Sequence, residues 1–191
     1  MTTTERPRPA LDRRRRRRRR ALVALGIVVV LVGAALGQRA HPYRLESTVE
    51  IDAPREVVWD VLTDFGAYPE WNPALVGMAG ELAVGETLRF ATDASDDALV
   101  FEPVVREVRP EEELRWEGRL LLGGLFDGEH SFELRETDTG GTVLVQVEDF
   151  RGIAVPFLTG WLRENTLPDF VAMNDALRER AEAGAVAIDD A

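Results

Sequence analysis

The chain has 191 residues, a net charge of −11 and no cysteine; this length allows one domain with a substantial core, and disulfides and thiol chemistry are excluded. All 23 basic residues are arginines, and the charge is segregated along the chain. Residues 1–39 carry eleven arginines against two acids, a net charge of +9, whereas residues 40–191 carry twelve arginines against 32 acids, a net charge of −20. The acidic part lacks the basic face that phosphate contacts need, so we expect no nucleic-acid partner.

The basic N-terminal part has the pattern of a membrane-targeting segment. Arg13 to Arg20 are an unbroken run of eight arginines, followed by 17 uncharged, mostly apolar residues at 21–37. As a helix these would span about 25 Å, slightly less than the ~30 Å hydrocarbon core of a bilayer, and arginine side chains can snorkel to the interface. We therefore predict a basic cytoplasmic head over residues 1–20 and a transmembrane signal anchor over residues 21–38.

A cleaved signal peptide is the alternative, because Ala-Leu-Gly before Gln38 is a passable cleavage site. In both cases the basic flank stays in the cytoplasm and the acidic domain lies outside it, either held in the cell membrane by a single pass or secreted. The arginines from Arg13 to Arg20 would then contact anionic lipid headgroups; nucleic acid is the less favoured partner for this run.

The acidic part begins as a strand followed by a short helix. Residues from Tyr43 to Ile51 alternate between apolar and polar, which is typical of a half-buried strand. Residues from Asp52 to Phe65 open with an acid and a proline and carry an apolar stripe at helical spacing. After the turn YPEWNP at residues 68–73 come several segments of strand character with short turns between them, which indicate an antiparallel meander.

The C-terminal part changes to a helical period over residues 157–183. Its apolar positions are Leu167, Phe170, Val171, Leu177 and Ala181. Pro168 is expected to kink or restart this helix, and residues 184–191 are expected to fray. A strand, a short helix, several strands and one long helix form an α+β arrangement.

Several of these segments resemble one known superfamily. They are IDAPREVVWDVLTDFGAYPEWNP, ELRWEG, DGEHSFEL, GGTVLVQVEDFRG and FVAMNDALRERAEA, in this order within residues 43–183. They resemble the SRPBCC superfamily, the START and birch-pollen-allergen-like group that includes polyketide cyclase/dehydrase-like and coenzyme Q-binding proteins. The resemblance implies a helix-grip fold, in which a curved antiparallel sheet of about seven strands wraps the C-terminal helix around a deep apolar cavity. Because the superfamily's functions are diverse, the fold implies a ligand-binding cavity but does not identify the ligand.

His130 is the first candidate for chemistry. By alternation, His130 shares a face with Phe126, Gly128 and Phe132, so we expect it to lie in the interior. It would be a structural histidine, an anchor for a ligand carbonyl, or a general acid or base; we favour the first two.

Two further polar residues are candidates. The resemblance places Glu148 inside the cavity, where it would donate a proton or pair with an arginine. Asn174 falls within the apolar stripe of the long helix, where an unpaired amide is costly, so it should bond a strand or a ligand. In the implied fold Trp71 lies near the cavity mouth, either as a wall for the ligand or as a plug of the core.

The predicted ligand-binding residues combine these polar groups with aromatic side chains. They are Trp71, Phe90, Phe101, Trp116, His130, Phe132, Glu148, Trp161 and Asn174. The chain contains no G-x-S-x-G, no phosphate-binding glycine loop and no H-E-x-x-H, so we expect no catalytic residue, metal or cofactor.

We therefore expect a membrane-tethered binding or carrier domain for a hydrophobic small molecule such as a lipid, a quinone or a polyketide-like compound, rather than an enzyme. One alternative is a cyclase- or dehydratase-type enzyme that uses His130 and Glu148 for proton transfer. Another is an acidic protein-interaction module whose cavity is closed by Trp71, Trp116 and Trp161.

Overall fold

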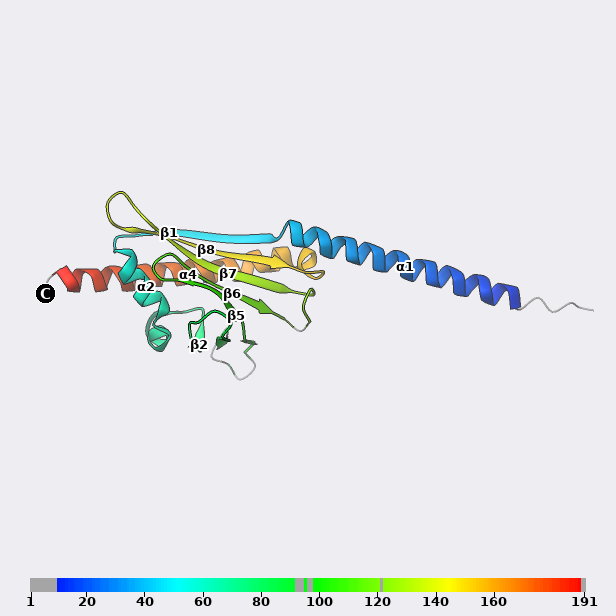
Figure 1. Ribbon diagram of the computed structural model, residues 1–191, viewed down its shortest axis with the longest axis horizontal. Coiled ribbons are helices and arrows are strands. Elements are labelled where there is room, and N and C mark those ends of the chain that lie inside the picture. Colours follow the sequence, from blue (N-terminus) through cyan, green and yellow to red (C-terminus); the bar gives the residue numbers. More distant parts are fainter. Residues whose placement is uncertain (1–9, 92–94, 96–97, 121, 190–191) are drawn as a thin grey trace, which may run out of the picture.

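The computed structural model describes residues 10–91, 95, 98–120 and 122–189, and consists of one long projecting helix followed by an α+β domain (Figure 1). The helices are α1 (Ala10–Ala40), α2 (Arg55–Thr63), the 3-10 turn η1 (Phe65–Ala67), α3 (Tyr68–Trp71) and α4 (Val155–Asp189). The strands are β1 (Tyr43–Ile51), β2 (Val76–Ala79), β3 (Arg89–Ala91), β4 (Val100–Phe101), β5 (Val104–Arg109), β6 (Glu113–Arg119), β7 (Asp127–Glu136) and β8 (Thr142–Arg151).

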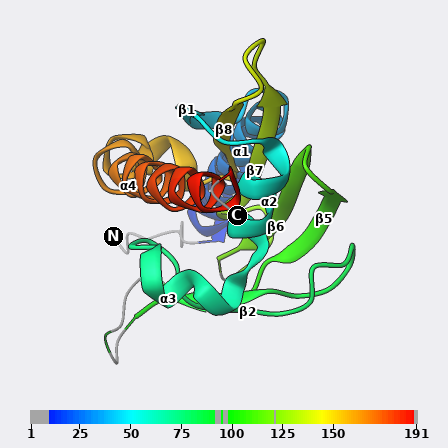
Figure 2. The same ribbon diagram turned by 90° about the vertical axis from the view of Figure 1, so that its left-hand side faces the viewer.

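The strands form two antiparallel sheets. The main sheet has the order β1-β8-β7-β6-β5, and the small sheet has the order β2-β3-β4. Viewed along α4, the main sheet curves around one side of this helix, which packs chiefly against β1 and α2 (Figure 2). A long helix held by a curved antiparallel sheet confirms the α+β, helix-grip prediction.

The number of strands differs from the prediction of about seven, because the described residues contain eight strands in two sheets. One of the segments of strand character, residues 98–108, is divided at the buried Pro103 into β4 and β5. Proline has no N–H to donate to a ladder, so the chain leaves one sheet there and joins the other. A single bridge between Thr87 and Val104 connects the two sheets.

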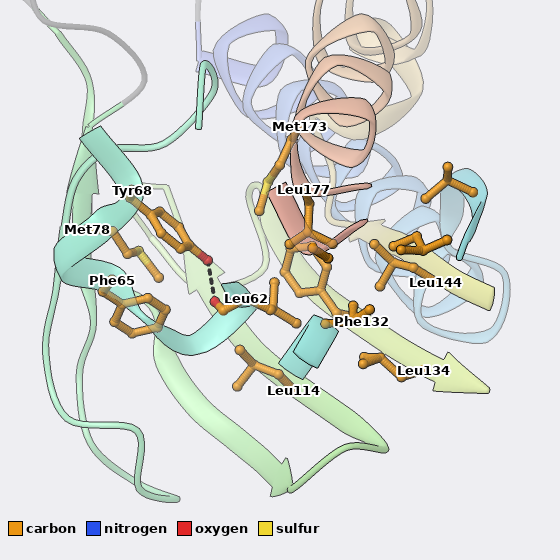
Figure 3. Close-up of a cluster of buried hydrophobic side chains, with 14 of the residues drawn as sticks. Leu62, Phe65, Tyr68, Met78, Leu114, Phe132, Leu134, Leu144, Met173 and Leu177 are labelled. Atoms are coloured by element: carbon orange, nitrogen blue, oxygen red, sulfur yellow. Dashed lines mark hydrogen bonds between the residues drawn. The ribbon is translucent and has the colours of Figure 1, made fainter. Parts of the chain in front are cut away.

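The turn YPEWNP closes one end of the core. Tyr68 is fully buried, and its hydroxyl donates a hydrogen bond of 2.6 Å to the carbonyl oxygen of Leu62 (Figure 3). The side-chain oxygen of Asn72 accepts hydrogen bonds from the backbone N–H groups of Ala74 and Leu75, which ends α3. Trp71 packs edge-on against Tyr68 with ring centroids 4.9 Å apart. This partly buried side chain therefore packs against the core from the end of α3.

Helix α4 is longer and more regular than the sequence predicted. It continues through Pro168, so the expected kink did not interrupt it, and it runs to Asp189, whereas the fraying of residues 184–191 stays a prediction from the sequence. Pro168 lies on the exposed side of the helix, while the C-terminal turns are held by Ala181 and Ala185, which pack against the core. Residues 190–191 lie outside the described part of the chain.

Helix α1 covers the segment predicted to cross the membrane. Within the part of the chain whose side chains the structure describes, no helix contains a stretch long and apolar enough to span a bilayer. The transmembrane anchor over residues 21–38 is therefore not confirmed and stays a prediction from the sequence. Residues 1–9 of the predicted basic head lie outside the described residues.

The buried tyrosine makes stability depend on alkaline pH. Burial raises the pKa of the Tyr68 hydroxyl above its ordinary value of about 10, because the ionised form is disfavoured in the core. The stability contributed by Tyr68 is therefore complete below pH ~10 and is lost as the pH rises above it, with a slope of about 1.4 kcal/mol per pH unit. Urea unfolding between pH 8 and pH 11 measures this slope directly, roughly the range in which tyrosine titrates.

Few side chains other than tyrosine titrate in this pH range, because of the composition of the chain. With no lysine and no cysteine, the two tyrosines are the only side chains whose ordinary pKa lies between about 8 and 12. Tyr68→Phe should abolish the slope, whereas the control Tyr43→Phe should retain it. A wild-type stability that does not change across this pH range would contradict the burial of Tyr68.

Candidate functional site

Three side chains from neighbouring strands lie in one row across the face of the main sheet that contacts α4. Trp116 of β6 is opposite His130 of β7, and His130 is opposite Glu148 of β8. Trp116 and His130 are almost fully buried, while Glu148 is partly exposed. His130 thus lies in the interior, as the alternation of its strand predicts.

Aromatic rings fix the position of His130, which is 7% exposed. Its imidazole stacks on the indole of Trp116, with centroids 5.1 Å apart and planes 13° apart. Phe170 of α4 packs edge-on against the imidazole at 5.0 Å, and Phe132 lies at 4.8 Å. This packing excludes water from the faces of the ring and leaves its two nitrogens to the neighbouring polar side chains.

Both nitrogens of His130 have polar neighbours. Nε2 lies 3.0 Å from the amide nitrogen of Gln146, and Nδ1 lies 3.5 Å from a carboxylate oxygen of Glu148. When the Gln146 amide donates to Nε2, the proton of the neutral imidazole is on Nδ1 and faces Glu148. The imidazole of His130 thus lies between a neutral amide and a carboxylate, an arrangement that suits proton transfer between His130 and Glu148 or the holding of one end of a polar ligand.

Next to this row, two facing glycines create a cavity. Gly118 of β6 is opposite Gly128 of β7, so the adjacent position on both strands lacks a side chain. A Cβ atom added to Gly128 would lie only 2.5 Å from a carboxylate oxygen of Glu148, which means that the carboxylate occupies the space above this glycine. The missing side chains leave room for Glu148 and for the cavity beside it.

The cavity measures about 50 Å³ and lies between the main sheet and the small sheet. Phe90 and Phe101 cover it as a stacked pair with centroids 5.6 Å apart. The lining residues are Phe90, Phe101, Pro103, Trp116, Gly118, Arg119, Leu120, Phe126, Gly128 and Glu148. Most of these are apolar, and the charged groups among them are Arg119 and Glu148.

This cavity differs from the deep apolar cavity that the resemblance implied. Ligand sites for drug-sized molecules measure roughly 300–1,000 Å³. The space between the sheet and α4 is filled instead by packed side chains, including the buried Leu114, Phe132, Leu144, Met173 and Leu177 (Figure 3). A ligand larger than a few atoms can enter only if covering side chains such as Phe90 and Phe101 move.

The structure brings together five of the predicted ligand-binding residues around this cavity and its row: Phe90, Phe101, Trp116, His130 and Glu148. Phe132 is fully buried beside His130 as part of the core.

The other three predicted residues lie apart from the cavity. Trp71 fills the core beside Tyr68, and its indole nitrogen is buried without a hydrogen-bond partner among the described residues. The Asn174 amide donates to the hydroxyl oxygen of Ser47 at 3.1 Å, which is the strand contact expected as one of its two roles. Trp161 is 58% exposed on the outer side of α4 and does not line the cavity.

The sequence prediction missed Gln146 and the glycine pair. Gln146 is on the same face of β8 as Glu148, two residues away, but alternation alone left both faces of this strand plausible and did not indicate the contact with His130. Among the described residues, no group of three histidine or acidic side chains is close enough to hold a metal ion.

Comparison with known proteins identifies the family. Residues 42–182 match the family described as polyketide cyclase / dehydrase and lipid transport. The chain belongs to this family. The match confirms the predicted SRPBCC superfamily. A separate search of curated proteins found no sequence that matches this chain.

Solved structures similar to this polyketide cyclase/dehydrase family member include two aromatase/cyclases. The di-domain ARO/CYC StfQ from the steffimycin biosynthetic pathway is 16% identical with a TM-score of 0.64, over 78% of this chain and 54% of that chain. This chain therefore spans about half the length of StfQ. The Zhui aromatase/cyclase from Streptomyces sp. R1128 is 20% identical with a TM-score of 0.59, over 73% and 93% of the two chains.

A third similar structure, TTHA0849 from Thermus thermophilus, is 16% identical with a TM-score of 0.59, over 74% of this chain and 99% of that chain. At these identities the similarity shows the fold alone.

Adding a single methyl group at position 128 tests whether the Glu148 carboxylate occupies the space above Gly128. We expect Gly128→Ala to destabilise the protein by about 0.5–1.5 kcal/mol relative to Gly118→Ala, because the new Cβ pushes the carboxylate at the end of the flexible Glu148 side chain out of its rotamer. Gly118→Ala is the matched control, since its Cβ would meet no atom closer than 3.7 Å and should be tolerated. Urea unfolding of both variants measures the difference.

A second-site variant separates this clash from a general effect on the strand. Shortening the acid in Gly128→Ala/Glu148→Ala should recover part of the lost stability, because the two side chains compete for one space. Equal stability losses in Gly118→Ala and Gly128→Ala would contradict the arrangement described.

Proposed function

We propose that the domain binds a hydrophobic small molecule, such as a lipid, a quinone or a polyketide-like compound, in the cavity beside Glu148. The observation that carries this proposal is the cavity at the facing glycines, with mostly apolar walls and a carboxylate beside a buried histidine. A largely apolar site with a few convergent polar groups is typical of small-molecule binding. Membership of a family described as polyketide cyclase / dehydrase and lipid transport supports the same class of ligand.

The cavity would enlarge to admit such a ligand. Phe90 and Phe101 are only partly buried, and their strands β3 and β4 are paired at two positions. Such short pairings belong to the least stable parts of a fold, so rotation of these rings is less costly than opening the core near Leu114 and Phe132. The small sheet, rather than α4, would thus adapt to the ligand.

The polar groups would fix the orientation of the ligand. Glu148 lines the cavity directly, whereas His130 lies behind it and contacts Glu148. A hydroxyl group on the ligand would donate to the Glu148 carboxylate, and the apolar remainder would lie against Trp116 and Phe126. Such a hydrogen bond in an apolar site discriminates strongly against compounds that lack the hydroxyl group.

Ligand binding can be tested on the full chain purified from a membrane-containing host. We expect native mass spectrometry to find a bound apolar compound, and organic extraction to identify its class. Gly118→Val fills the cavity from a position without close neighbours, so it should weaken binding of the same compound by more than about tenfold. An empty wild-type protein whose thermal stability is unaffected by lipids, quinones and aromatic polyketides would instead favour the interaction-module alternative.

An enzyme of the cyclase or dehydratase type is the second candidate, and the Gln146–His130–Glu148 arrangement favours it. In such an enzyme the pair of His130 and Glu148 would move a proton at the bound substrate. The same extracted compound distinguishes the two functions. Its conversion by the wild type, with loss of turnover in both His130→Ala and Glu148→Gln, would make the protein an enzyme; turnover that survives both substitutions would exclude this mechanism.

We also propose, from the sequence, that the chain is attached to the cell membrane through residues 21–37 with the acidic domain outside the cytoplasm. The support is the apolar run behind the arginines from Arg13 to Arg20, which would face anionic headgroups. A reporter enzyme that is active only outside the cytoplasm, fused after Ala191, should be active. Activity only of a reporter that works inside the cell would overturn this orientation.

A further inference from the structure

Three segments that are far apart in the sequence meet at the end of the domain next to α1. They are the end of α1 with the start of β1, the loop from β6 to β7, and the turn from β8 into α4 (Figure 1). The hydroxyl of Tyr43, at the start of β1, donates a hydrogen bond of 3.1 Å to the carbonyl oxygen of Thr159 in the first turns of α4. The start of α4 is thus held beside the point where α1 leaves the domain.

Backbone hydrogen bonds hold the other two segments together. The N–H groups of Ile153 and Ala154 donate to the carbonyl oxygens of Gly124 and Leu125 at 3.1 and 3.0 Å. Gly152 has a positive φ, and a Cβ at this position would lie 2.4 Å from the Leu125 carbonyl oxygen. The loop and the turn are therefore in close contact and form one surface.

Large apolar side chains are exposed on this surface. Phe157 is 87% exposed, Trp161 is 58% exposed, and Leu122 in the β6–β7 loop is 74% exposed. On α1, which leaves the domain at this end, the described apolar side chains from Leu22 to Val32 are each more than half exposed. Exposed aromatic and aliphatic groups gathered at one end of a domain mark an interaction surface.

The charge of the three segments indicates the partner. Residues 13–45, 118–126 and 150–163 contain no acidic residue, although residues 40–191 as a whole contain 32 acids. The same segments contain arginines, among them Arg119, Arg151 and Arg163. Arg119 pairs with Glu117 and Arg151 pairs with Asp149, so the net positive charge of this surface is smaller than its number of arginines. A surface with exposed aromatic groups and no acid within its own segments matches the interface of an anionic bilayer, where tryptophan and arginine are favoured.

Three of the acids that flank these segments have hydrogen-bond or ion-pair partners, whereas two others, Glu46 and Glu164, are exposed. Glu117 is hydrogen-bonded to Arg106 and Arg119; burial acts to raise its pKa, but these two guanidinium groups outweigh the burial and keep the pKa below its ordinary value. Asp149 pairs with Arg44, and Asp127 accepts a hydrogen bond of 2.8 Å from the backbone N–H of Gly124. Repulsion between these carboxylates and anionic headgroups is reduced accordingly.

We propose that this end of the domain is a bilayer-contacting surface for anionic lipid, with Phe157, Trp161 and Leu122 in the interfacial layer. The ligand cavity lies next to it, because Leu120 and Phe126 of the same β6–β7 segment line the cavity. A hydrophobic ligand would therefore pass between the bilayer and the cavity without crossing water. The transfer of a ligand between the bilayer and the cavity rests on the proposed ligand binding and membrane attachment. The contact of this surface with lipid can be measured separately.

The test places the full chain in vesicles of phosphatidylcholine and phosphatidylglycerol whose phosphatidylcholine is brominated on its acyl chains. Bromine quenches only tryptophans that reach the lipid, and the difference between the wild type and Trp161→Phe isolates the emission of Trp161 among the four tryptophans. We expect brominated lipid to quench Trp161 and acrylamide in the water to quench it weakly. Quenching of Trp161 by acrylamide but not by brominated lipid would overturn the contact.

A matched pair of charge variants on α4 tests the surface without altering the cavity. Phe157→Glu places a carboxylate on the proposed surface, so it should reduce quenching of Trp161 by brominated lipid. Val186→Glu introduces the same charge at a position 61% exposed near the other end of α4 and should leave the quenching unchanged. Equal effects of the two variants would overturn the proposed location.

Vesicle flotation in the same samples separates this inference from the functions on which it rests. A chain that floats with the vesicles but whose Trp161 is not quenched keeps the membrane attachment and loses the contact surface. Protection of Trp161 from both quenchers, together with crosslinking between chains, would assign the surface to a second copy and overturn the lipid contact. Loss of ligand binding is measured independently by mass spectrometry.

Discussion

The rest of the structure depends on the pairing register of β8. This strand lies between β1 and β7, and side chains alternate between the two faces of each strand, so its register determines which residues of three strands face α4. In the observed register Glu148 lies opposite His130 on one side and Leu45 on the other. A shift of one residue would turn Glu148 to the other face of the sheet and replace it with Val147. The contact between His130 and Glu148 and the filling of the space above Gly128 would be lost together.

Polar groups lie in the core at a cost in stability, one of them on β8 and one on α4. Gln146 and Asn174 are almost fully buried, and one side-chain oxygen of each lacks a hydrogen-bond partner among the described residues. An unsatisfied buried polar atom costs about 1–3 kcal/mol. Both residues lie between α4 and the sheet, and Gln146 contacts His130. Departures from an apolar core are expected where a site requires them, which is consistent with a functional role for the row that ends at Glu148.

The sequence predicted what depends on local periodicity and missed what depends on the meeting of distant residues. Alternation along β7 placed His130 inside, and the helical period located α4, because both patterns are repeated over many residues. The cavity could not be predicted from Gly118 or Gly128 alone, since the two glycines meet only through the β6–β7 register. Trp161 was assigned to the cavity although the rotation of α4 is set by the burial of other residues, among them Leu162, which turns Trp161 outward.

The distribution of charge along the sequence also differs from its distribution in the folded domain. Along the sequence, charge separates a basic N-terminal part from an acidic domain, and the domain as a whole would repel an anionic bilayer. In the fold, residues 118–120, 122–126 and 150–163 lie together beside α1, so the described acid-free parts of the domain are concentrated at one end. Most acids lie on the remaining surface, where repulsion from anionic headgroups would keep that part of the domain away from the bilayer. Attraction at one end and repulsion elsewhere would orient the domain, with the cavity next to the lipid from which a hydrophobic ligand would come.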